Sequence, residues 1–103
     1  MSFVYLISNI DNDKICKIGV TKKKNIEDRK KQLQTGSSNE LYIRSYHETK
    51  YPYKIEKMLH RHFNEKKILN EWFELSDEDI KNFNDICNKY ENILLSLIDN
   101  PFF

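Results

Sequence analysis

Four positions along this chain carry residue types that could act on a phosphate ester. They are, in chain order, Tyr5, Lys17-Ile18-Gly19, Arg29 and Glu56. A phenol, a glycine that lets a backbone approach closely, a fixed cation and a carboxylate are the groups that metal-assisted cleavage of a phosphodiester needs. No single position is diagnostic, and the indication comes from their order.

The first two positions belong to a predicted β-hairpin. Residues 3–8 are β-branched and aromatic and apolar on both faces, which predicts a central strand, while residues 15–21 alternate as a half-buried strand does. With a turn centred near Asp11, Tyr5 lies opposite Lys17, and their Cβ atoms are about 5 Å apart. A slip of one residue would place the two side chains on opposite faces.

Arg29 and Glu56 lie in two predicted helices on either side of a third strand. The first helix ends before Gly36, which is a good terminator. Residues 41–46 alternate in polarity and predict the strand. The second helix begins at Pro52, and Glu56 lies at the edge of its apolar stripe. That stripe comprises Ile55, Met58, Leu59, His62 and Phe63.

The C-terminal part of the sequence predicts a short extended segment and a long helix. Residues 72–75 are expected to plug the core, and Ser76 with Asp79 gives a capping-box signal. The apolar stripe of the helix that follows comprises Ile80, Phe83, Cys87, Tyr90, Leu94 and Leu97. A stripe this wide most often completes the core of its own chain, and a homodimer through this helix is the open alternative.

Together these elements predict an α/β (α+β) fold. We expect a small, three-stranded, mainly antiparallel sheet flanked by helices, with a long C-terminal helix. At 103 residues the chain is long enough for one core. Residues 1–76 are therefore expected to form the main domain, and residues 77–103 a C-terminal helix and tail packed on it.

The net charge of +1 conceals a strong polarity along the chain. Residues 1–64 carry 13 Lys and Arg against 7 Asp and Glu, whereas residues 65–103 carry 4 against 9. The positive excess gathers at Lys14, Lys17, Lys22, Lys23, Lys24, Arg29, Lys30 and Lys31. A solvated helix face is the ordinary interpretation of such a run. Because this cluster flanks the candidate site, it fits a surface for a nucleic-acid backbone better.

Several other classes of protein fit the sequence poorly. No stretch approaches the roughly 18 apolar residues of a membrane span, and the N-terminus lacks a secretory signal pattern, so we expect no membrane partner and an intracellular location. Cys16 and Cys87 have apolar neighbours and are expected to pack as small hydrophobes without a disulfide. His47, His60 and His62 lack the spacing of a zinc site.

Five segments carry a family resemblance. They are Phe3-Val4-Tyr5-Leu6-Ile7, Cys16-Lys17-Ile18-Gly19-Val20-Thr21, Glu27 to Leu33, Ile55-Glu56-Lys57-Met58-Leu59-His60 and Glu71-Trp72-Phe73-Glu74-Leu75. Their order and spacing resemble the GIY-YIG endonuclease superfamily, and the branch that fits best is typified by a phage open-reading-frame-172 domain and usually labelled DNA-binding. Lys17 stands where a second tyrosine often does, which fits the phage-type branch.

The resemblance implies a role for each site residue. Tyr5 would help to activate the attacking water, and Lys17 could favour its phenolate or contact a phosphate. Arg29 would stabilise charge in the transition state, and Glu56 would hold one Mg²⁺ or Mn²⁺. The substrate-binding residues would be Gly19, Lys22, Lys23, Lys24, Lys30, Lys31 and His60.

The implied function is that of a metal-dependent endonuclease that hydrolyses DNA phosphodiester bonds by a one-metal mechanism. Two alternatives from other classes stay open. One is a catalytically silent DNA-binding module of the same fold, and the other is an interaction protein that dimerises. Divalent-dependent nicking of plasmid DNA would support the enzyme over both alternatives.

Overall fold

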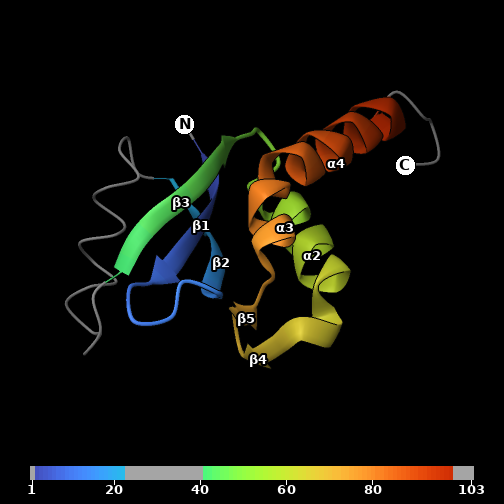
Figure 1. Ribbon diagram of the computed structural model, residues 1–103. Coiled ribbons are helices and arrows are strands. Elements are labelled where there is room, and N and C mark those ends of the chain that lie inside the picture. The colour runs from blue at the N-terminus through green and yellow to red at the C-terminus, as the bar shows by residue number, and fades with distance from the viewer. Residues whose placement is uncertain (1, 23–40, 99–103) are drawn as a thin grey trace.

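The computed structural model describes residues 2–22 and 41–98, which form an antiparallel sheet with helices packed on one side (Figure 1). In chain order the elements are β1 (Phe3–Asn9), β2 (Ile15–Thr21), β3 (Leu41–Glu48), α2 (Pro52–His62), the 3₁₀ helix η1 (Asn64–Lys66), β4 (Lys67–Leu69), β5 (Trp72–Glu74), α3 (Asp77–Lys81) and α4 (Phe83–Ile98). The predicted α+β class and long C-terminal helix are confirmed. The predicted helix that contains Arg29 lies outside the described residues.

The prediction of three strands is wrong, because β4 and β5 add a second hairpin. Within the described residues the sheet has five strands in the order β3-β1-β2-β5-β4. β4 and β5 have three residues each, too few to show a period of two in the sequence. Leu69 pairs with Trp72 across a two-residue loop, in which Asn70 has a φ of 54°, a left-handed conformation that asparagine tolerates. Phe73 pairs with Cys16, so the predicted extended segment is a strand of the sheet.

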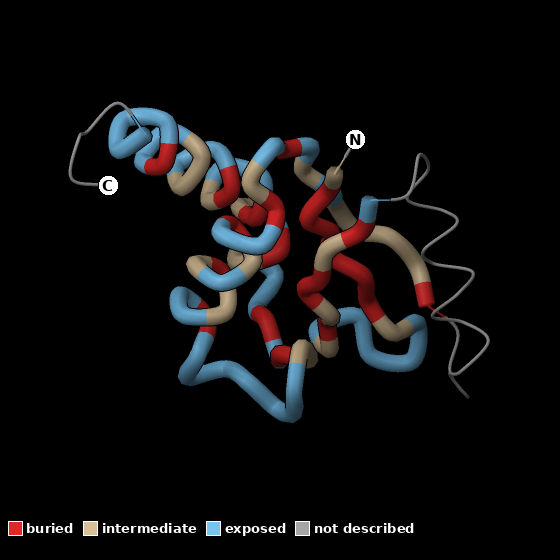
Figure 2. Tube along the Cα trace, turned by 180° about the vertical axis from the view of Figure 1, so that it is seen from behind, coloured by how far each residue is buried: buried red, intermediate tan, exposed pale blue. Residues whose placement is uncertain are grey.

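β1 lies inside the sheet, between β3 and β2, and is buried on both faces, as its composition predicts (Figure 2). Val4 and Leu6 belong to the main core cluster, on the face that the helices cover. Tyr5 and Ile7 alternate with them and form a smaller cluster with Leu41 on the opposite face. The sheet therefore separates two apolar layers.

α3 and α4 contribute to the main core together with β1, β2 and α2. Their buried members are Ile80, Phe83, Cys87 and Leu94. Residues 77–98 are two helices where the stripe predicted one, because the chain leaves helical geometry at Asn82. α4 then runs in a different direction from α3 (Figure 1). No helix in the described ranges is long and apolar enough to span a bilayer.

Local signals in the sequence set where two of the helices begin. Pro52 occupies the first turn of α2, where its missing N–H costs nothing. The predicted capping box before α3 is confirmed, because Ser76 Oγ accepts from the N–H of Asp79 at 3.1 Å and the Asp79 carboxylate accepts from the N–H of Ser76 at 3.1 Å. The cysteines are free and buried as predicted, and burial raises the pKa of Cys87 to about 12.

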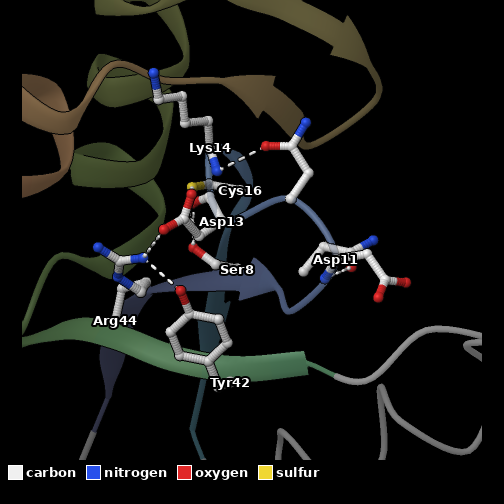
Figure 3. Close-up of polar contacts among 9 residues, drawn as sticks. Ser8, Asp11, Asp13, Lys14, Cys16, Tyr42 and Arg44 are labelled. Carbon is white, nitrogen blue, oxygen red and sulfur yellow. Dashed lines mark hydrogen bonds and ion pairs between the residues drawn. The ribbon is translucent and has the colours of Figure 1, made fainter.

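The β1–β2 turn is held by a network of polar contacts (Figure 3). The side chain of Asn12 accepts from the N–H of Lys14 at 3.1 Å, and Ser8 Oγ donates to the carbonyl of Asp13 at 3.0 Å. Arg44 on β3 adds an ion pair to the Asp13 carboxylate at 3.7 Å. These contacts connect the turn to β1 and β3 and determine where the chain reverses direction.

The register of the hairpin differs from the predicted one. Tyr5 pairs with Gly19, and Ile7 pairs with Lys17, so the turn is centred on Asn12. The prediction that Tyr5 lies directly opposite Lys17 is therefore wrong by two residues. Because a shift of two preserves the face of the sheet, Tyr5 and Lys17 still project to the same side.

Candidate active site at the edge of strand β2

α2 meets the edge of β2 at the point where β2 leaves its neighbour β5. The β2–β5 pairing ends at Lys17, and the next residue, Ile18, donates its N–H to the carbonyl of Glu71 at 3.1 Å. The carbonyl of Ile18 accepts a hydrogen bond from His60 Nε2 on α2 at 3.1 Å. This contact holds the flank of α2 that carries Glu56 and His60 against β2.

Charged side chains of both signs gather at this edge. Lys17 Nζ lies 2.9 Å from Glu71 Oε2, and the Lys17 side chain is only 15% exposed. Glu56 is half-buried. Its burial, and then the negative charge of Glu71, raise the pKa of Glu56 above its ordinary value, whereas His60 and Lys17 oppose that shift. The site thus places two carboxylates beside an amine and an imidazole.

His60 has a defined tautomer in this arrangement. A carbonyl oxygen can only accept, so the Nε2 that bonds Ile18 carries the hydrogen. The imidazole also packs edge-on against Phe73, with ring centroids 5.0 Å apart. Any contact between this ring and Glu56 or a phosphate therefore involves Nδ1.

Gly19 makes room for the phenol of Tyr5. Tyr5 is fully buried, and a Cβ at position 19 would lie 2.3 Å from its hydroxyl oxygen and 2.5 Å from its Cζ. Both distances are shorter than non-bonded atoms can adopt. The glycine of the Lys17-Ile18-Gly19 run is therefore required by its directly paired neighbour on β1.

Comparison with known protein families shows which family the chain belongs to. Residues 2–88 match the family model described as the T5orf172 domain. The chain belongs to the T5orf172 domain family. The match confirms the resemblance to the phage-type branch and extends through α3 into α4. The T5orf172 domain is a nuclease-like and DNA-binding-like domain. Among curated proteins and solved structures, nothing matches the chain.

This T5orf172 domain brings together three of the predicted site residues and one that the sequence did not single out. Lys17, Glu56 and His60 converge with Glu71. Glu71 was missed because its approach to Glu56 depends on β5 pairing with β2, a contact between distant segments that no local pattern reveals. The signal that could have found it was its position directly before Trp72, at the start of the last family segment.

The remaining predicted residues lie around this cluster or beyond the described parts. Tyr5 and Gly19 face each other within the β1–β2 pair. Lys22 follows β2 directly, is exposed, and has its Nζ 5.8 Å from the ring centroid of Tyr53, one helical turn before Glu56 on α2. Lys23, Lys24, Arg29, Lys30 and Lys31 lie outside the described residues.

The two carboxylates suit a hard divalent cation. Mg²⁺ is usually held by one or two carboxylates, with water and substrate phosphates filling its other positions. The described residues contain no group of three or more metal-ligating side chains, whereas Glu71 is close enough to Glu56 for its charge to raise the pKa of Glu56. A cation beside them would offset that repulsion. The residues present therefore fit Mg²⁺ or Mn²⁺.

Proposed function

We propose that this T5orf172 domain is an endonuclease that hydrolyses DNA phosphodiester bonds with one Mg²⁺ or Mn²⁺. The observation that carries the proposal is Glu56, whose carboxylate is half-buried beside a second carboxylate, Glu71, at the edge of β2. Burying a carboxylate is unfavourable unless its charge is compensated. A perturbed ionisable group in a cluster of charged side chains is typical of functional sites.

Glu56, Glu71 and Lys17 have roles that their positions in the cluster support. Glu56, with Glu71 beside it, would hold the ion, which when bound stabilises negative charge on the phosphoryl oxygens. Lys17 would contact a phosphate by exchanging its bond to Glu71 for one to the substrate. Tyr5 is assigned to water activation and Arg29 to charge stabilisation by family resemblance.

Nicking of supercoiled plasmid tests the proposal. Wild-type protein is expected to convert supercoiled to open-circular DNA with Mg²⁺ or Mn²⁺ and to stop when EDTA is added. Glu56→Gln keeps the shape of the side chain but removes the ligand charge, so it should abolish nicking. Glu74→Gln is the matched control, because Glu74 is an exposed carboxylate on β5. If folded wild-type protein nicks no DNA with either metal, the proposed endonuclease activity is refuted.

A second variant separates catalysis from binding. If Arg29 stabilises charge only in the transition state, Arg29→Ala should lower the nicking rate by about 10²- to 10³-fold while the affinity for DNA changes little. Nicking rates with saturating metal and binding in EDTA give the two quantities. Equal losses in rate and affinity would assign Arg29 to substrate binding.

A catalytically silent DNA-binding module is the second candidate, and two observations favour it. Tyr5 is fully buried, and the amine of Lys17 is engaged by Glu71. The phenol is then shielded from a water nucleophile, and the amine is already paired with a carboxylate. Metal-independent, salt-sensitive retention of DNA without nicking would identify this function.

A further inference from the structure

We propose that the outward side of α2 is a docking surface for the phosphate backbone of DNA. We define the α2 basic face as Lys54, Lys57 and Arg61. This inference rests on the proposed DNA substrate and adds a binding surface that does not involve the metal site. It also differs from the lysine cluster around residues 22–31 that the sequence indicated.

The three cations line one open pocket. Lys54, Lys57 and Arg61 surround a hollow of about 230 Å³, and Met58 and Leu94 supply its apolar lining. Positions three and four residues apart lie on one side of a helix, so these side chains are neighbours in space. Leu94 comes from α4, which means that the packing of α2 against α4 shapes this surface.

The charged residues in the described lining of this pocket all carry positive charge. No Asp or Glu is among those described lining residues. A second hollow elsewhere on the molecule shows the contrast, since its Lys14, Lys66 and Lys67 share the lining with Glu65 and Glu74. Cations gathered around one pocket are expected to attract a polyanion.

The spacing of the α2 basic face matches a nucleic-acid backbone. Lys54 to Arg61 spans roughly 10 Å of helix axis at about 1.5 Å per residue. One strand of B-DNA advances about 3.4 Å per phosphate, so three cations over this length can meet about three successive phosphates. The apolar lining from Met58 and Leu94 suits the carbon atoms of the deoxyribose that lies between phosphates.

The α2 basic face adjoins the candidate active site on the same helix. Lys57 directly follows Glu56, and Arg61 directly follows His60, so each cation is turned about 100° around the helix axis from a site residue. Glu56 and His60 lie on the flank that faces β2. A DNA strand held by the cations would therefore pass beside the edge of β2, where the carboxylates of Glu56 and Glu71 lie.

Binding to duplex DNA in EDTA tests this surface without any contribution from cleavage. The variant Lys57→Glu/Arg61→Glu should bind at least tenfold more weakly at low salt. The slope of log affinity against log salt should flatten by roughly 0.9 for each phosphate that the variant no longer neutralises. The matched control is Lys67→Glu/Lys81→Glu, which has the same change in net charge on two exposed lysines outside the α2 basic face and outside the basic cluster of the sequence, and its affinity should stay within about threefold of wild type.

Several outcomes would overturn the inference. They are an equal loss of affinity in both double variants, an unchanged salt slope in the α2 variant, and competition by polyglutamate that is as strong as competition by DNA. Should the reversal variant not fold by circular dichroism, Lys57→Gln/Arg61→Gln replaces it, with half the charge change and the same expected direction. If wild-type protein binds DNA through this face but does not nick it, the docking surface is supported and only the proposed endonuclease activity is refuted.

Discussion

Glu56 ionises in a setting that opposes its charge, and this has a consequence for stability. Burial and Glu71 raise the pKa of Glu56 in the folded chain above its ordinary value of 4.5. In acid the Glu56 carboxyl is protonated in both the folded and the unfolded chain, so burial of the site does not lower the free energy of unfolding. As pH rises from about 4.5 through the folded pKa, the unfolded chain ionises more readily and the folded state loses stability.

Glu56→Gln is therefore expected to raise the melting temperature at pH 7, and the gain should disappear as the pH falls toward 4. Thermal melts between pH 4 and pH 8, with Glu74→Gln as the control, measure the effect. Saturating Mg²⁺ should stabilise wild type but not the Gln variant, because a ligand that binds the folded state stabilises it. If the difference in melting temperature between wild type and Glu56→Gln does not depend on pH, the charge of Glu56 does not interact with the cluster.

Gly19 is a position at which the sheet leaves no room for a side chain. Gly19→Ala drives a methyl group into the phenol of Tyr5, and overpacking of this kind typically costs about 1–3 kcal/mol. Chemical denaturation measures the loss of stability. Since Cζ of Tyr5 also lies within 2.5 Å of the added carbon, Tyr5→Phe should not rescue Gly19→Ala. Full rescue would show that the hydroxyl alone makes the contact.

At the scale of elements, α3 and α4 are expected to complete the core. Phe83, Cys87 and Leu94 are buried in one cluster with residues of β1, β2 and α2. A fragment of residues 1–76 should therefore be unfolded by circular dichroism, whereas the fragment 1–98 should melt cooperatively. A soluble fragment 1–76 with a cooperative melt would instead assign the C-terminal helix to dimerisation.

A pair of substitutions on α4 separates its inner and outer sides. Phe83→Ala removes a fully buried ring and should cost about 3–5 kcal/mol. Leu95 is 49% exposed, so Leu95→Ala should change stability by less than about 0.5 kcal/mol. Urea denaturation gives both values. A large, concentration-dependent effect of Leu95→Ala would show that α4 also binds a second copy.

The sequence predicts the elements better than it predicts their pairing. A run of β-branched and aromatic residues located β1, alternation located β2 and β3, and Pro52 and Ser76 marked where α2 and α3 begin. The turn centre at Asn12 was missed because side chains of β1 and β3 also bond the loop. Glu71 and the sheet position of β5 were missed for a related reason, since both arise from contacts between segments about 55 residues apart. Local patterns contain no information about such contacts.

At the scale of the whole molecule, charge divides along the chain and therefore between elements. The basic residues 1–64 include β1, β2, β3 and α2, while the acidic remainder includes β4, β5, α3 and α4. The first turn of α3 alone carries Asp77, Glu78 and Asp79. A polyanion should therefore approach the protein from the side of β2 and α2, where Lys22 and the α2 basic face lie, and be repelled from the acidic first turn of α3.

The lysines that follow β2 are expected to act with the α2 basic face. Lys22→Glu/Lys23→Glu/Lys24→Glu should weaken binding to all DNA sequences about equally, because lysines that bind phosphates read no sequence information. The salt slope should flatten by roughly 0.9 for each phosphate that these side chains neutralise in the wild type. If the two surfaces bind separate parts of the backbone, combining this triple variant with Lys57→Glu/Arg61→Glu should reduce the binding free energy by the sum of the two separate effects. Anisotropy titrations at four salt concentrations measure all three variants, and an unchanged slope in the triple variant would exclude these lysines from the interface.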